Sequence, residues 1–148
     1  MGRGVYLQSR YGGNGASIHL DNVSVENSGS QGVLVLGSKR NFTMKNCNVS
    51  HSKRDGLGVG DGGLMTIDGN ATNIHHNGTN GCGHYGLYTY SSGSIHLVSP
   101  LTKEMISTNN HGGRNYGGEG TIKSVDKDGK VLEVVYDGTP DGEEEDDY

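Results

Sequence analysis

Apolar and polar residues alternate in short segments along most of the chain, and each set of segments begins with a glycine. Side chains two residues apart lie on the same face of a β-strand, so this alternation predicts strands with one buried face. The glycine-led segments start 28, 24 and 30 residues apart, which is typical of a solenoid whose turns bury one another. These segments are residues 4–7, 32–35, 56–59 and 86–89.

Two further apolar positions follow each glycine-led segment. The middle position is occupied by Ile18, Phe42, Met65 and Ile95. The last position is occupied by Val25, Val49, Ile74 and Ile106, and a polar stretch then leads to the next glycine. No segment has a sustained helical period, so the chain is predicted to be all-β with three strands in each turn.

The glycine-led unit of three strands resembles the repeat of right-handed parallel β-helix proteins, the pectate-lyase-like superfamily, over residues 4–110. The resemblance implies a short right-handed single-stranded parallel β-helix of about four turns. Equivalent side chains would then form interior columns about 4.8 Å apart. One column would hold Val5, Val33, Leu57 and Leu87, and another would hold Ile18, Phe42, Met65 and Ile95.

The same resemblance implies a second inward position in the glycine-led strands. Val35 and Val59 are expected to point inward between Leu7 and Thr89, and Leu34 is expected to point outward, where a charge would be tolerated. The open ends of so short a helix would expose strand edges, which predicts a cap or a homo-oligomer formed through those ends.

The repeat pattern stops before residue 117. Alternating segments at 121–125 and 130–136 flank an Asp-Gly pair, which predicts a β-hairpin. This stretch has a weak resemblance to the central strands of Tudor-type SH3-like barrels, but it is too short for five strands and lacks an aromatic cage. We therefore assign residues 1–116 to the β-helix, 117–138 to a hairpin cap and 139–148 to an acidic tail.

Composition and charge exclude several classes of function. Glycine makes up 27 of 148 residues, and seven of the 17 acidic residues lie within positions 137–148, so the rest of the chain is near neutral. A near-neutral body does not predict nucleic-acid binding, and no apolar segment approaches the roughly 18 residues that cross a membrane. Cys47 and Cys82 form neither a disulfide framework nor a zinc pattern, so we expect no metal and no cofactor. The absence of a signal-peptide pattern leaves the localisation unassigned.

One polar cluster suggests catalysis. His51, Lys53 and Arg54 end the second turn, and His76 falls at the position of His51 one turn later. A basic side chain beside a histidine can abstract a proton next to a uronate carboxylate, which is the chemistry of polysaccharide lyases and uronate epimerases. The Asp-Pro-His-Asp motif of alginate epimerases and the close acidic pairs of galacturonan hydrolases are absent, however. Catalysis by His51, Lys53, Arg54 and His76 is therefore the second hypothesis.

Tyrosines suggest binding instead. Tyr6 and Tyr88 occupy the outward position of their strands, and Tyr90 lies close by in the sequence. Tyrosine rings can stack on sugars while their hydroxyls make hydrogen bonds. The sequence therefore favours a structural or carbohydrate-recognising module with a polysaccharide as its partner. A lyase or epimerase, and an assembly protein such as a viral or cell-surface fibre, remain the alternatives.

Overall fold

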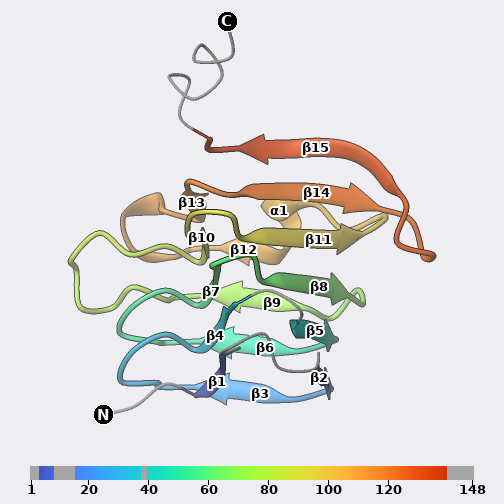
Figure 1. Cartoon of the computed structure of the whole chain (residues 1–148). Coiled ribbons are helices and arrows are strands. Elements are labelled where there is room, and N and C mark those ends of the chain that lie inside the picture. The colour runs from blue at the N-terminus through green and yellow to red at the C-terminus, as the bar shows by residue number, and fades with distance from the viewer. Residues whose placement is uncertain (1–3, 9–15, 38–39, 140–148) are drawn as a thin grey trace, which may run out of the picture.

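The computed structural model describes residues 4–8, 16–37 and 40–139, and it is a parallel β-solenoid of about four turns (Figure 1). Three sheets, here called A, B and C, run along the stack. Sheet A has the order β1 (Val5–Gln8), β4 (Val33–Leu36), β7 (Leu57–Gly60), β10 (Leu87–Thr89) and β13 (Tyr116–Gly118). All these neighbours pair in parallel. The fold predicted from the sequence is confirmed at this level.

Sheets B and C complete each turn. Sheet B contains β2 (Ala16–Asp21), β5 (Arg40–Lys45), β8 (Leu64–Asp68), β11 (Ser94–Val98), β14 (Thr121–Val125) and β15 (Val131–Asp137). Sheet C contains β3 (Ser24–Glu26), β6 (Asn48–Ser50), β9 (Asn73–His75) and β12 (Ser107–Thr108). Two short helices lie in the fourth turn; the first follows β11 of sheet B, and the second follows β12 of sheet C. They are α1 (Lys103–Ile106) and a single 3₁₀ turn, His111–Gly113.

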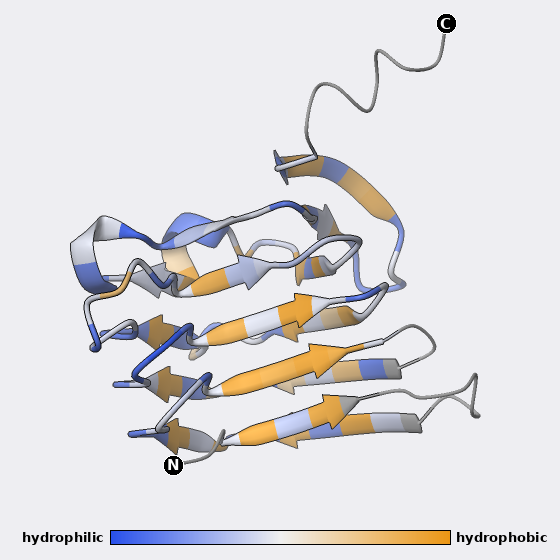
Figure 2. Cartoon of the chain, turned by 60° about the vertical axis from the view of Figure 1, so that its left-hand side comes forward, coloured by the Kyte–Doolittle hydropathy of each residue, from blue (hydrophilic) through white to orange (hydrophobic). Residues whose placement is uncertain are grey.

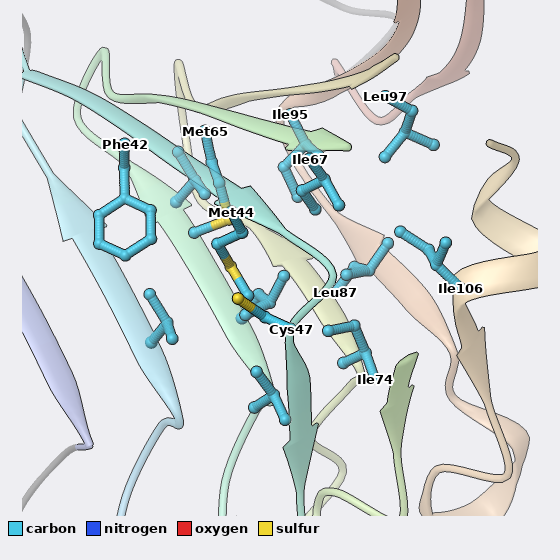
Figure 3. Packing of buried hydrophobic residues seen from close by; sticks show 14 of the residues in the cluster. Phe42, Met44, Cys47, Met65, Ile67, Ile74, Leu87, Ile95, Leu97 and Ile106 are labelled. Carbon is cyan, nitrogen blue, oxygen red and sulfur yellow. The ribbon is translucent and has the colours of Figure 1, made fainter. Parts of the chain in front are cut away.

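The interior columns are confirmed. Val5 pairs with Val33, Val33 with Leu57 and Leu57 with Leu87, and the column that begins at Ile18 continues through Phe42, Met65 and Ile95 in the same way. Figure 2 shows apolar positions recurring at the same place in successive turns, and Figure 3 shows Phe42, Met65 and Ile95 among the buried side chains. Stacking of identical turns therefore builds one continuous core.

The glycine that opens each turn is explained by close packing between turns. A Cβ on Gly32 would lie 2.7 Å from the carbonyl oxygen of Gly56, and a Cβ on Gly56 would lie 2.8 Å from that of Gly86. Real Cβ atoms do not approach so closely, and Gly4 makes the same contact with the carbonyl oxygen of Gly32, whereas a Cβ on Gly86 would meet the side chains of Ser107 and Asn110. Glycine therefore recurs at these positions because these close contacts leave no room for a side chain.

Buried asparagines hold the corner that leads from sheet C to sheet A. The Asn77 side chain is completely buried; its Oδ1 accepts the Ser52 N–H at 3.0 Å and its Nδ2 donates to the Val49 carbonyl at 3.1 Å. One turn later, Asn110 Oδ1 accepts the N–H of Asn77 at 3.0 Å. The column thus satisfies backbone groups that the corner would otherwise bury without partners.

Two details correct the expectations from the sequence. Ser107 rather than Ile106 pairs with Ile74, because α1 inserts one helical turn and sends Ile106 into the core from the helix. β13 and β14 pair in parallel with β10 and β11, so they begin a fifth turn. The predicted hairpin is confirmed, because β14 and β15 pair antiparallel and extend sheet B.

The outer face of sheet A also differs from the expectation. Leu34 points outward but is only 3% exposed. It lies over Gly58, where a Cβ would be 3.0 Å from the Leu34 side chain and 3.2 Å from the Tyr90 ring. The outward position is therefore not open to water, and this burial predicts that a charge at Leu34 would be destabilising.

Candidate functional site

Three tyrosine rings gather on the outer face of sheet A. Leu87 and Thr89 are completely buried, so Tyr88 between them points outward from β10. Its ring lies 5.3 Å from that of Tyr85, with 29° between their planes, and 4.7 Å from that of Tyr90, with 79° between their planes. The rings border a hollow of about 500 Å³, here called the tyrosine hollow, which is lined by Asp55, Gly83, His84, Tyr85, Tyr88, Tyr90 and Gly118.

Neighbouring strands leave room for these rings because they carry glycine at the outward positions. Gly58 and Gly117 are the register partners of Tyr88 on either side. A Cβ on Gly117 would come within 2.5 Å of the Tyr85 ring, and one on Gly58 would come within 3.2 Å of the Tyr90 ring. The Tyr85 and Tyr90 rings therefore pack closely against the sheet at positions where the strands carry glycine.

Asp55 lies buried beside the tyrosine hollow, with only 2% of its surface exposed. Its Oδ1 accepts the backbone N–H of Tyr85 at 2.7 Å, and its Oδ2 accepts a long hydrogen bond of 3.4 Å from the Tyr90 hydroxyl. His84 Nδ1 lies 3.6 Å from Oδ1. Burial raises the pKa of the Asp55 carboxyl, although the hydrogen bond from Tyr85 and the nearby His84 act in the opposite direction.

Nearby carboxylates raise the pKa of two tyrosines that line the hollow. Burial raises the pKa of both Tyr88 and Tyr90, and the nearby charge of Asp55 raises each pKa further. Glu119 adds to this effect on the pKa of Tyr88. The Tyr90 hydroxyl also accepts a hydrogen bond of 3.2 Å from Gln31 Nε2, which fixes the orientation of that ring.

A second, smaller hollow is lined by polar residues that lie next in the chain to residues of the tyrosine hollow. It holds about 170 Å³ and is here called the serine hollow. Its lining consists of Ser91, Ser92, Gly93, Ser94, Glu119, Gly120, Thr121 and Thr139. Ser91 follows Tyr90 and Glu119 follows Gly118 in the chain, so consecutive residues at the ends of β10 and β13 line the two hollows.

The histidines predicted for catalysis lie at a different corner. His51 and His76 adopt positive φ angles of 58° and 57°, as do Asn27 and Asn109 at the equivalent positions of other turns. The His51 and His76 rings stack with centroids 5.3 Å apart and planes 6° apart. Together with His111, they border a hollow of about 290 Å³. The expected proximity of His51 and His76 is therefore present.

His75 joins this group of imidazoles. Its Nδ1 lies 2.7 Å from Nδ1 of His76, and its Nε2 lies 2.8 Å from Oδ1 of Asn48. Burial lowers the pKa of His75, and the neighbouring His76 and His51 lower that pKa further. In the described part of the chain, no set of three or more His, Cys, Asp or Glu side chains is arranged to hold a metal ion.

The remaining predicted residues are separated from both groups. Lys53 and Arg54 are exposed and line neither the tyrosine hollow nor the histidine-bordered one. Tyr6 is 42% exposed on β1 and shares an outward column with Tyr88, but Leu34 and Gly58 lie between them. Of the three predicted binding tyrosines, the structure brings Tyr88 and Tyr90 together and leaves Tyr6 three strands away.

Asp55, His84 and Tyr85 complete the hollow, although none of them is among the catalytic or binding residues predicted from the sequence. One signal for His84 and Tyr85 was present in the sequence. The interval from Gly56 to Gly86 is 30 residues, against 24 from Gly32 to Gly56, and the longer connection includes Gly83, His84 and Tyr85. An insertion in a regular repeat marks a loop free to build a site. The burial of Asp55 has no such signal.

Comparison of the chain with protein-family models, with curated proteins and with solved structures finds no match in any of the three. The stacked parallel sheets establish the parallel β-helix architecture, and no comparison assigns the chain to the pectate-lyase-like family. In the described residues, no helix is long and apolar enough to cross a membrane.

Proposed function

We propose that this protein recognises a carbohydrate chain, which it binds in the tyrosine hollow on sheet A. The observation that carries the proposal is the gathering of Tyr85, Tyr88 and Tyr90 around a hollow that also contains Asp55. Tyrosine rings provide apolar surface for a sugar ring, and their hydroxyls provide hydrogen bonds. A volume of about 500 Å³ lies within the range of small-molecule sites.

The serine hollow supports a ligand longer than one sugar. Its serine and threonine side chains carry hydroxyls that donate and accept hydrogen bonds. Sugar hydroxyls need such partners once water is displaced. A chain that leaves the tyrosine hollow past Tyr90 and Gly118 would meet these groups next.

The lyase or epimerase hypothesis has less support. A uronate carboxylate needs a positive group or metal beside it when the neighbouring proton is removed. Among the described residues, no lysine or arginine lines the tyrosine hollow, and Lys53 and Arg54 do not line the hollow beside His51 and His76. Binding without turnover is therefore the better-supported function.

Isothermal titration with a panel of oligosaccharides tests the proposal. We expect Tyr88→Ala to weaken binding of the recognised sugar by about 1–2 kcal/mol, because it removes the central ring. His19→Ala serves as the control, because it removes an exposed ring from sheet B and should leave the affinity unchanged. Failure to bind any oligosaccharide contradicts the proposal, and turnover of a uronate polymer would favour the lyase hypothesis.

A further inference from the structure

Among the described residues, no lysine or arginine pairs with the buried Asp55 carboxylate in the tyrosine hollow. The His84 imidazole lies 3.6 Å from its Oδ1, and its hydrogen bonds come from the Tyr85 N–H and the Tyr90 hydroxyl. A buried carboxylate is costly in its charged form unless an opposite charge lies beside it. A bound cation would supply that charge.

The aromatic rings favour the same kind of ligand. A cation is attracted to a tyrosine ring within about 6 Å of the ring centroid. The Tyr88 and Tyr90 rings lie 4.7 Å apart with planes 79° apart, so both can flank one bound group. Aromatic rings together with a carboxylate are a suitable environment for an ammonium group.

The surrounding charges are also negative. Glu119 lines the serine hollow and lies near enough to Tyr88 to affect its titration. The linings described for the two hollows contain two carboxylates, Asp55 and Glu119, one imidazole, that of His84, and neither lysine nor arginine. An anionic sugar would be repelled here, and a cationic sugar would be attracted.

From this geometry we infer that the recognised carbohydrate is an amino sugar, whose protonated amine lies among the tyrosine rings against Asp55. The inference rests on the proposed function, since it specifies the ligand class of the same hollow. Acetylation of the amine removes its charge, so it should weaken binding. A carboxylate on the sugar should weaken binding further.

Titration with matched oligosaccharides tests the inference. The probes are the β-1,4-linked tetramers of glucosamine, of N-acetylglucosamine and of glucose, together with a galacturonate tetramer. Measurements at about pH 6 keep the amines mostly protonated, because an amine beside electron-withdrawing groups titrates near neutral pH, as an α-amino group does. We expect the glucosamine tetramer to bind at least about tenfold more tightly than the N-acetylated and glucose tetramers, and the galacturonate tetramer to bind most weakly.

Charge-neutral variants locate the effect. Asp55→Asn retains an oxygen acceptor for the Tyr85 N–H, and it should abolish the preference for the glucosamine tetramer over the N-acetylated tetramer. Glu133→Gln removes one negative charge from the exposed part of β15 and should leave the preference intact. If Asp55→Asn fails to fold, Glu119→Gln provides the second test and should reduce the preference.

The outcomes separate the two claims. Equal or tighter binding of the N-acetylated, glucose or galacturonate tetramer overturns the amino-sugar inference and leaves carbohydrate recognition standing. Retention of the full preference in Asp55→Asn, or in Glu119→Gln where that variant replaces it, also overturns the inference. If none of these or the wider panel of oligosaccharides binds, both the proposed function and the inference fail.

Discussion

The Asp55 carboxylate accepts the backbone N–H of Tyr85, 30 residues further along the chain, at 2.7 Å. This hydrogen bond joins the end of one turn to the loop that precedes β10 in the next. It places the Tyr85 ring over Gly117 and holds a carboxylate beside the tyrosine hollow. A structural contact between turns and the candidate binding site therefore share the same residue.

Replacement of Asp55 should change how stability depends on pH. The raised pKa means that the folded protein holds this proton more tightly than the unfolded chain, whose aspartate has a pKa near 3.9. The resulting stabilisation is complete below about pH 3.9 and is lost as the pH rises through the raised pKa. The free energy of unfolding of wild type, minus that of Asp55→Asn, should therefore fall with rising pH over this window.

Urea unfolding of the two proteins at a series of pH values measures this difference. The same pair should be compared in a His84→Gln background, because that imidazole lies 3.6 Å from the carboxylate and faces it together with the Tyr90 hydroxyl and the Tyr85 N–H. A difference that rises with pH over this window would show that Asp55 is more acidic in the folded protein than in the unfolded chain.

A charge placed in the interior column should unfold the solenoid. Val35 is completely buried and pairs with Leu7 and Val59, so Val35→Asp should cost more than about 3 kcal/mol of unfolding free energy. Leu132→Asp, at a side chain that is 55% exposed on β15, should cost less than about 0.5 kcal/mol. Equal effects in urea denaturation would contradict the assignment of the inward face.

Leu34→Asp distinguishes the covered outer face from an open one. Leu34 is 3% exposed, and its side chain and the Tyr90 ring both lie close to Gly58, so we expect destabilisation by about 2–3 kcal/mol and a displaced Tyr90 ring. Urea denaturation measures the loss, and near-ultraviolet circular dichroism reports on the tyrosines. Unchanged stability and spectrum would mean that the outward position is open to water.

Removal of a buried asparagine should weaken the corner between sheets C and A. Asn77→Ala loses hydrogen bonds to the Ser52 N–H and the Val49 carbonyl, and we expect a cost of about 2–3 kcal/mol. Asn73→Ala, at an exposed position of β9, is the matched control and should change stability by less than about 0.5 kcal/mol. Thermal and urea unfolding of both variants would reveal whether the two asparagines differ as expected.

Loss of the C-terminal strands should promote self-association. Deletion of residues 117–148 removes β14 and β15, including the completely buried Ile122 that pairs with Ile95, and exposes the edge of β11. Deletion of residues 142–148 should be harmless, and these residues lie outside the described part of the chain. Sedimentation velocity measures both; a monomeric product of the longer deletion would refute the role of these strands as a cap.

The repeat of glycine and apolar residues was enough to determine the solenoid and its register. In a stack of parallel turns, each turn makes the same contacts with the next, so the contacts appear in the sequence as a period. The column through Val33, Leu57 and Leu87 is read from that period, and the structure then explains the recurring glycines by the close contacts at Gly32 and Gly56.

Only the tertiary structure decided the contacts that do not repeat. α1 replaces the expected pairing of Ile106 with that of Ser107, and the Leu34 and Tyr90 side chains, which come from strands two apart, both lie close to Gly58. Asp55 meets His84 and Tyr85, which lie in the longer connection that precedes β10. Such contacts depend on the path of one loop and occur once, so they leave no repeating pattern in the sequence from which they could be predicted. The architecture could therefore be predicted from the chain, whereas the arrangement of the candidate site required its three-dimensional structure.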